Sequence, residues 1–74
     1  MEEKIKKIFL KHINKSDINY NLIKEEKIST FFDSLDFVEF LIDIEEVFLI
    51  EISDKEIYSL KNLKDLENLI LKKL

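Results

Sequence analysis

Cysteine, glycine, proline and tryptophan are all missing from this chain of 74 residues. Without cysteine the chain can form no disulfide, and it offers no thiol nucleophile and no thiolate ligand for zinc. Without glycine it cannot build a glycine-rich loop that cradles phosphate groups. The lack of both glycine and proline also removes the usual breakers of helices and the residues of tight strand turns. The sequence therefore predicts an all-α protein in which any thiol chemistry must be imported.

Long apolar runs are also missing. Lysines interleave with isoleucine and phenylalanine in residues 4–11, so the start of the chain has no continuous apolar segment like that of a secretory signal. No other run approaches the ~18 residues of a membrane span. A chain this short buries only about 60% of the surface of its unfolded form, so the core is modest and stability is marginal. We expect one domain over residues 1–74, monomeric and cytoplasmic.

The negative charge is concentrated in the middle of the chain. Residues 33–56 contain nine Asp or Glu and one Lys, whereas residues 1–32 contain seven Lys and five acids, and residues 57–74 contain four Lys and two acids. An acidic segment repels nucleic acid, which is bound by cationic contacts to phosphate, and it attracts basic protein surfaces. The pattern favours a protein partner with a basic patch over nucleic acid. A merely solvated helix face remains the alternative.

Groups suited to catalysis are few. The single histidine, His12, has no second histidine or cysteine with which to form a metal site or a catalytic triad, and a surface position is the simpler interpretation. The carboxylates show neither the spacing of a calcium-binding loop nor a partner for acid–base catalysis. The sequence therefore predicts no catalytic residue and no metal ligand.

Apolar spacing predicts a small four-helix bundle with three longer helices and one short one. The first helix covers residues 2–13. Residues 14–33 contain many turn-forming residues and scattered apolar ones, which indicates a long loop with room for a short helical turn and pinned by its own side chains. The second helix starts at Ser34 or Leu35 and ends near Phe48. A capping box at residues 53–56 begins a short third helix, and Asn62 caps the last helix, over residues 63–74.

The helix expected over residues 34–48 has three faces. Its core face comprises Phe37, Leu41, Ile44 and Phe48, with Phe40 and Val47 at the edge. Acidic residues form a second face, comprising Asp36, Glu39, Asp43 and Glu46. A second, narrower apolar stripe lies beyond these acids and consists of Leu35, Val38 and Ile42, with Glu45 beside it. Because so small a domain cannot bury both apolar stripes, the second one indicates a surface on which a partner docks.

Ser34 precedes this helix and has two interpretations. As an N-cap it would accept a hydrogen bond from a backbone N–H of the first turn, which is a common role of serine. As an attachment point it would hold an anionic group at the positive end of the helix dipole, next to the docking residues. One hydroxyl can serve both roles.

The stretch from Asp33 to Glu56, DSLDFVEFLIDIEEVFLIEISDKE, resembles the signature of the acyl carrier protein family. It contains the Asp-Ser-Leu motif, then Val38 and Glu39 followed by Glu45, Glu46 and Phe48, and then the Glu-Ile-x-Asp-x-Glu continuation that begins at Glu51. Length, acidity and helix spacing extend the resemblance to the whole chain, and residues 59–70 are similar to the last helix of the family.

The resemblance implies a carrier that is not an enzyme. Ser34 would hold 4′-phosphopantetheine, transferred from coenzyme A by a separate phosphopantetheinyl transferase, and the terminal thiol of this arm would carry acyl groups as thioesters for fatty-acid or related biosynthetic enzymes. Apolar faces around Phe37, Leu41 and Ile44 would border a cavity for the growing chain. The surface recognised by basic patches of the synthases, reductases and transferases would comprise Asp33, Leu35, Asp36, Val38, Glu39, Ile42, Glu45 and Glu46.

Some residues depart from the family pattern. No glycine stands just upstream of Asp33, residues 47, 49 and 50 are apolar where the general fatty-acid carriers are usually acidic or polar, and Phe37 replaces what is commonly a smaller residue. These differences favour a specialised carrier with a dedicated partner. Two alternatives stay open: a carrier of an amino acid, of the D-alanyl or peptidyl type, and an unmodified acidic adaptor.

Overall fold

Helices dominate the parts of the chain that the structure describes, residues 2–13 and 19–74 of a computed structural model. The helical segments are α1 (Glu2–Ile13), α2 (Tyr20–Ile23), the 3-10 helix η1 (Ile28–Thr30), α3 (Ser34–Phe48), α4 (Asp54–Ser59) and α5 (Leu63–Lys73). No strand occurs within these described ranges. The prediction of an all-α fold with three longer helices is confirmed.

Two of the predicted helix starts are stabilised by the expected side-chain caps. The Ser53 Oγ accepts a hydrogen bond from the Glu56 backbone N–H at 3.2 Å, and the Glu56 Oε1 accepts one from the Ser53 N–H at 2.9 Å, which completes the capping box of α4. At the start of α5, the Asn62 Oδ1 accepts from the Asp65 N–H at 2.8 Å. Local sequence therefore determines where these two helices begin.

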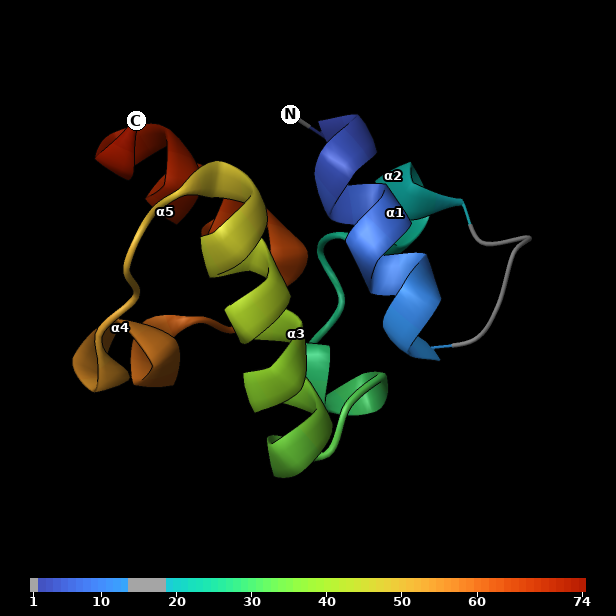
Figure 1. Ribbon diagram of the computed structural model, residues 1–74. Coiled ribbons are helices and arrows are strands. Elements are labelled where there is room, and N and C mark those ends of the chain that lie inside the picture. The colour runs from blue at the N-terminus through green and yellow to red at the C-terminus, as the bar shows by residue number, and fades with distance from the viewer. Residues whose placement is uncertain (1, 14–18) are drawn as a thin grey trace.

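The arrangement of the helices places α3 at the centre. In Figure 1, α1 and α2 lie to the right of α3 and α4 lies to its left, while α5 passes behind α3 toward the upper left. The start of α3 is at the end of the molecule opposite to the start of α1 and the end of α5 (Figure 1). The residues around Ser34 are thus kept away from both ends of the chain.

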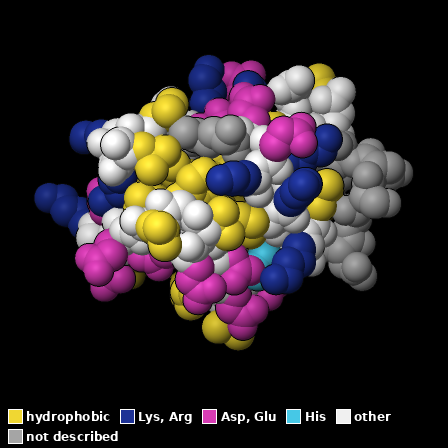
Figure 2. Space-filling model, turned by 45° about the horizontal axis from the view of Figure 1, so that its top comes forward, with side chains coloured by type: hydrophobic (Ala, Val, Ile, Leu, Met, Phe, Trp, Pro, Cys, Tyr) yellow, Lys and Arg dark blue, Asp and Glu magenta, His cyan; other side chains and the backbone are white. Residues whose placement is uncertain are grey.

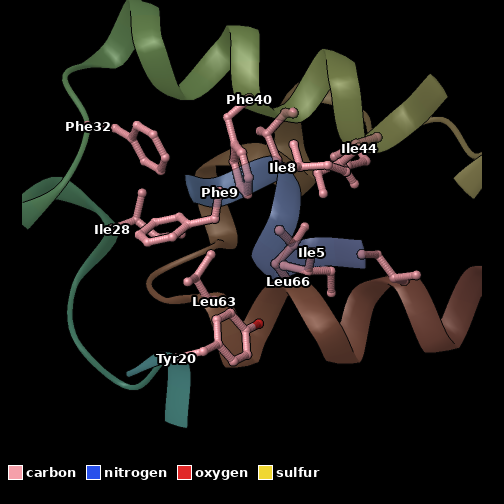
Figure 3. Close-up of a cluster of buried hydrophobic side chains, with 13 residues drawn as sticks. Ile5, Ile8, Phe9, Tyr20, Ile28, Phe32, Phe40, Ile44, Leu63 and Leu66 are labelled. Carbon is pink, nitrogen blue, oxygen red and sulfur yellow. The ribbon is translucent and has the colours of Figure 1, made fainter. Parts of the chain in front are cut away.

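An aromatic cluster fills the core beneath the first half of α3. Phe40 is fully buried and stacks on Phe32, with their ring centroids 5.1 Å apart, while Phe9 of α1 meets both rings edge-on at 6.1 and 5.4 Å. Figure 3 shows Phe32 beside Phe40, with Phe9 and Ile28 below them. Edge-to-face and offset pairs of this kind contribute about 0.5–1.5 kcal/mol each beyond the burial of area.

The prediction that Phe40 lies at the edge of the core face was wrong. Phe40 is 0% exposed, whereas Phe37 and Phe48, which were assigned to the centre, are only half-buried. The reason is tertiary: α1 and the segment before α3 cover one flank of α3, and Phe40 points toward them. Val47, expected beside it, is 45% exposed.

The segment expected as a long loop contains two short helices where the structure describes it, and residues 14–18 lie outside the described residues. Tyr20, Ile28 and Phe32 are buried, so the prediction that side chains pin this segment is confirmed. The Tyr20 hydroxyl donates a hydrogen bond to the Glu67 Oε1 of α5 at 2.7 Å. Burial and this bond raise the pKa of Tyr20 above its ordinary value, so the phenol stays protonated and keeps α2 attached to α5.

A leucine ends α3 in the left-handed conformation. Leu49 has φ 56° and ψ 47°, and its N–H donates to the Glu45 carbonyl as a cap. Glycine usually occupies this position, since a Cβ atom there costs about 1–2 kcal/mol. The Leu49 side chain is 89% exposed, so it gains little packing in return. Leu49 therefore has an unfavourable backbone conformation that burial of its side chain does not offset.

Replacing Leu49 by glycine should stabilise the fold by about 1 kcal/mol, because it removes the steric cost of the left-handed conformation and sacrifices no buried contact. Urea unfolding measures the change. The matched control is Leu22→Gly in α2, where the helical backbone gains nothing from glycine and stability should fall. A loss of stability in Leu49→Gly would show that this side chain packs more than its exposure indicates.

A polar contact joins α1 to α3 next to the aromatic cluster. The His12 Nε2 lies 2.7 Å from the Asp43 Oδ2, and the Lys11 Nζ lies 3.7 Å from the same oxygen. The His12 side chain is only 15% exposed and packs edge-on against the Phe40 ring at 5.8 Å. The interpretation of His12 as a surface residue was therefore wrong: Asp43 of the acidic face pairs with it across the helix interface.

This contact should make stability depend on pH in acid. The hydrogen bond from His12, and then the charge of Lys11, lower the pKa of Asp43 below its ordinary 3.8. Because the unfolded chain then binds this proton more readily than the folded chain, the contact makes its full contribution to stability above pH 3.8. That contribution is lost as pH falls through the lowered pKa of Asp43. Asp43→Asn should therefore be less stable than the wild type at pH 6, and the difference should shrink by pH 2 to 3. Thermal melts along this pH series, with Asp54→Asn as the control, measure it. A constant difference would contradict the assignment.

Candidate functional site

Ser34 is the first helical residue of α3, and its side chain is exposed. The cap is the preceding residue: Asp33 has an extended backbone, with ψ 177°, and its Oδ1 accepts the Asp36 N–H at 2.8 Å. The interpretation of Ser34 as the N-cap is therefore wrong. Its hydroxyl is left without a capping role, at the positive end of a helix dipole.

Two grooves meet at Ser34, and Phe37 and Leu60 line both of them. We call the larger one the linker groove; its volume is about 600 Å³ and it runs between η1 and the α4–α5 connection. It is lined by Lys27, Ile28, Ser29, Phe32, Asp33, Ser34, Phe37, Leu60 and Lys61. The α4 groove, of about 390 Å³, is lined by Ser34, Phe37, Val38, Asp54, Ile57, Tyr58 and Leu60. Ser34 therefore has an apolar groove on each side.

Backbone hydrogen bonds hold the two walls of the linker groove together. The Ile28 N–H donates to the Lys61 carbonyl at 2.8 Å, and the Lys64 N–H donates to the Lys24 carbonyl at 3.1 Å. The Lys61 N–H in turn donates to the Asp65 Oδ2 at 3.0 Å. The groove was not predicted, because these segments are far apart in the sequence and carry no local signal of their contact.

The second apolar stripe of α3 is exposed next to Ser34, as predicted. Leu35, Val38 and Ile42 are 68%, 43% and 47% exposed. The side chains of Asp33, Asp36, Glu39 and Glu46 are exposed as well. On the face shown in Figure 2, acidic side chains gather along the lower edge with hydrophobic ones between them.

The remaining member of the predicted partner surface, Glu45, has an internal contact. Its Oε2 accepts the Ile52 N–H at 2.8 Å, and its side chain is half-buried. Glu45 thus stabilises the connection from α3 to α4. Of the residues expected to border a cavity for a growing chain, Phe37 lines the grooves, while Leu41 and Ile44 are 2% and 0% exposed in the core.

Groups for other kinds of site do not gather in the described residues: none of their His, Asp and Glu side chains form a cluster of three that could hold a metal ion. None of the helices described here is long and apolar enough to cross a membrane. What stands out is an exposed serine at a helix start, between two apolar grooves and beside an acidic surface.

Comparison with protein families explains this arrangement. The family model described as "Phosphopantetheine attachment site" matches residues 30–70, which include Ser34, most of both groove linings and the whole of α3. The chain belongs to this family. No curated protein and no solved structure matches it. The resemblance to the acyl carrier protein family is thus confirmed for the carrier domain.

Membership of the phosphopantetheine attachment-site family establishes the coarse function. The protein is a phosphopantetheine-bearing carrier, and domains of this family are not catalytic. Its covalent cofactor is 4′-phosphopantetheine, whose thiol supplies the group that the cysteine-free sequence lacks. The residues present fit this cofactor, because an exposed hydroxyl adjoins grooves large enough to hold a flexible arm.

Proposed function

We propose that the chain is an acyl carrier protein in which Ser34 holds the phosphopantetheine arm. The observation that supports this most directly is the position of Ser34: exposed, relieved of capping by Asp33, and at the junction of both grooves. The other serines near the grooves differ in this respect. Ser29 lies in η1, and Ser53 is occupied as the cap of α4.

Attachment requires a phosphopantetheinyl transferase. The Ser34 Oγ forms a bond to the phosphorus that carries the pantetheine in coenzyme A, its proton passes to a base of the transferase, and the bond to the adenosine bisphosphate leaving group breaks. The N-terminus of α3 favours the resulting anionic phosphodiester through its dipole. The chain contributes the hydroxyl and its exposure, and the transferase contributes the catalysis.

The surface formed by Asp33, Leu35, Asp36, Val38, Glu39, Ile42, Glu45 and Glu46 is the proposed docking site for the transferase and for enzymes that load or use the cargo. Exposed carboxylates on this face attract basic patches over a distance, and the apolar side chains between them are desolvated in the complex. We assign Glu45 a lesser part, because one of its oxygens already binds the Ile52 N–H.

Reversing two of these charges should slow encounter with the transferase by about tenfold at low ionic strength, because electrostatic steering raises association rates 10-fold or more. The variant is Glu39→Lys with Glu46→Lys, both exposed on α3. The rate of arm transfer at subsaturating carrier concentration measures the effect, and salt should reduce the difference.

The matched control is Glu3→Lys with Glu26→Lys, which changes the net charge equally at exposed positions away from this face. Equal slowing in both variants would attribute the effect to net charge and contradict a docking surface on α3. Circular dichroism checks that both variants fold.

The cargo decides between an acyl carrier and an aminoacyl carrier. We favour acyl cargo, on the resemblance of residues 33–56 to acyl carriers, and a specialised pathway, on the apolar residues 47, 49 and 50. Intact mass of the protein purified from its native source tests the proposal, with fragmentation to localise the arm. An acyl group on a Ser34-linked arm is the expected result; an amino acid on the arm would select the aminoacyl carrier, and an arm on another residue would overturn the assignment of Ser34.

A further inference from the structure

The two grooves beside Ser34 differ in charge. Lys27 and Lys61 line the linker groove together with a single acid, Asp33, whereas Asp54 is the only charged residue that lines the α4 groove. Both lysines are exposed, and neither forms an ion pair within the described parts of the chain. An anionic phosphodiester on Ser34 is therefore attracted toward the linker groove and repelled from the α4 groove.

The floor of the linker groove is closed by aromatic rings. Phe32 and Phe37 line it, and both stack on the buried Phe40, with centroid distances of 5.1 Å for Phe32 and 6.5 Å for Phe37. Phe32 and Phe37 are themselves 6.2 Å apart and nearly parallel, at 29°. Phe9 supports Phe32 from below, edge-on at 5.4 Å. A stack this well filled leaves no passage from the groove into the core.

The residues that line the two grooves also indicate that neither groove opens into the core. Neither groove reaches any of the fully buried side chains, which are Phe9, Phe40, Ile5, Leu41, Ile44, Leu63, Leu66 and Ile70. A chain that entered the core would have to displace Phe37 and separate a stack whose contacts are each worth about 0.5–1.5 kcal/mol.

We propose that the linker groove receives the arm with a short acyl group, and that Phe37 excludes long chains from the core. Phe37 is then the residue that determines the length of cargo the protein can shelter, and Lys27 and Lys61 direct the arm into this groove. The carried substrates are short acyl thioesters. This inference rests on the proposed attachment of the arm to Ser34.

NMR of the full chain tests the proposal. A broad-specificity transferase loads it with pantetheine alone, or with butyryl, octanoyl or palmitoyl groups from the corresponding coenzyme A thioesters. Compared with the unmodified chain, the butyryl form should shift the amides of Ile28, Ser29 and Lys61 more than those of Ile57 and Tyr58. The palmitoyl form should leave the Leu41 and Ile44 methyl signals in place and melt no higher than the octanoyl form.

Variants separate the two parts of the proposal. Lys27→Gln with Lys61→Gln should remove most of the shift at Ser29, whereas Lys7→Gln with Lys55→Gln, two exposed lysines outside both grooves, should retain it. Phe37→Leu removes one aromatic ring from the floor of the groove and keeps an apolar side chain there. In this variant the palmitoyl group should shift the methyl signals of Leu41 and Ile44.

Four results would overturn the inference. They are larger shifts at Ile57 and Tyr58 than at Ile28, retention of the Ser29 shift without the two lysines, palmitoyl shifts at Leu41 and Ile44 in the wild type, and a melting temperature that rises steadily with chain length. Failure of Ser34 to acquire an arm would overturn the proposed function and this inference with it, and the mass spectrum shows that outcome before any NMR comparison.

Discussion

Replacing Ser34 by alanine should abolish attachment of the phosphopantetheine arm. Incubated with coenzyme A and a broad-specificity transferase, the wild-type chain should gain the mass of the arm, and Ser34→Ala should gain none. The alanine variant should also fold normally, within about 0.5 kcal/mol of the wild type, because Ser34 is exposed and Asp33 caps the helix. Loss of modification in this variant is therefore not attributable to unfolding.

The neighbouring residues provide controls. Ser29→Ala and Ser53→Ala should still accept the arm, the second with a weaker start of α4 because its capping hydrogen bond is lost. Asp33→Ala should lose about 1 kcal/mol of stability, in contrast to Ser34→Ala. Equal gain of mass in Ser34→Ala and the wild type would end the assignment of Ser34, and a large loss of stability in Ser34→Ala would mean that the hydroxyl has a structural role.

Replacing Phe40 by alanine should leave much of the protein unfolded at 37 °C. Burial of Phe40 is complete, and its ring contacts Phe9, Phe32 and Phe37 as well as His12. Truncation of a buried phenylalanine costs about 3–5 kcal/mol, since the cavity collapses only in part. For a domain this small we expect a free energy of unfolding near the lower limit, roughly 5 kcal/mol, so this loss would remove most of it. Urea unfolding followed by circular dichroism measures the change.

Tyr58→Ala is the matched control, because it truncates an aromatic side chain that is 88% exposed. We expect a change within about 0.5 kcal/mol. Similar destabilisation by both substitutions would show that the aromatic stack around Phe40 does not carry the stability assigned to it. A Phe40→Leu variant, which retains part of the buried volume, should fall between the wild type and Phe40→Ala.

Local signals made most of the helices predictable from sequence. The capping box at Ser53 and the cap at Asn62 act over three or four residues, and the structure shows their hydrogen bonds as expected. The exposed stripe on α3 follows from helical periodicity alone. The N-cap of α3 was harder to predict, because Asp33 and Ser34 are both good capping residues. The N-cap is the one whose backbone is not yet helical, which is Asp33.

Contacts between distant segments could not be predicted in this way. The pairing of His12 with Asp43 and the burial of Phe40 both require knowledge of how α1 crosses α3. The linker groove likewise depends on a backbone bond between Ile28 and Lys61, to which no side chain contributes. The spacing of side chains along a helix predicts the faces of that helix, whereas these three features depend on how different helices and segments pack together.

The bond from the Ile28 N–H to the Lys61 carbonyl would also keep the linker groove in shape while the proposed cargo enters and leaves it. This bond joins the two walls, and the bond from Lys64 to Lys24 joins the same two segments a short way along the chain. Passage of cargo past Ser34 would break neither of these main-chain bonds. An enzyme bound over the start of α3 could then unload the carrier without loosening its fold.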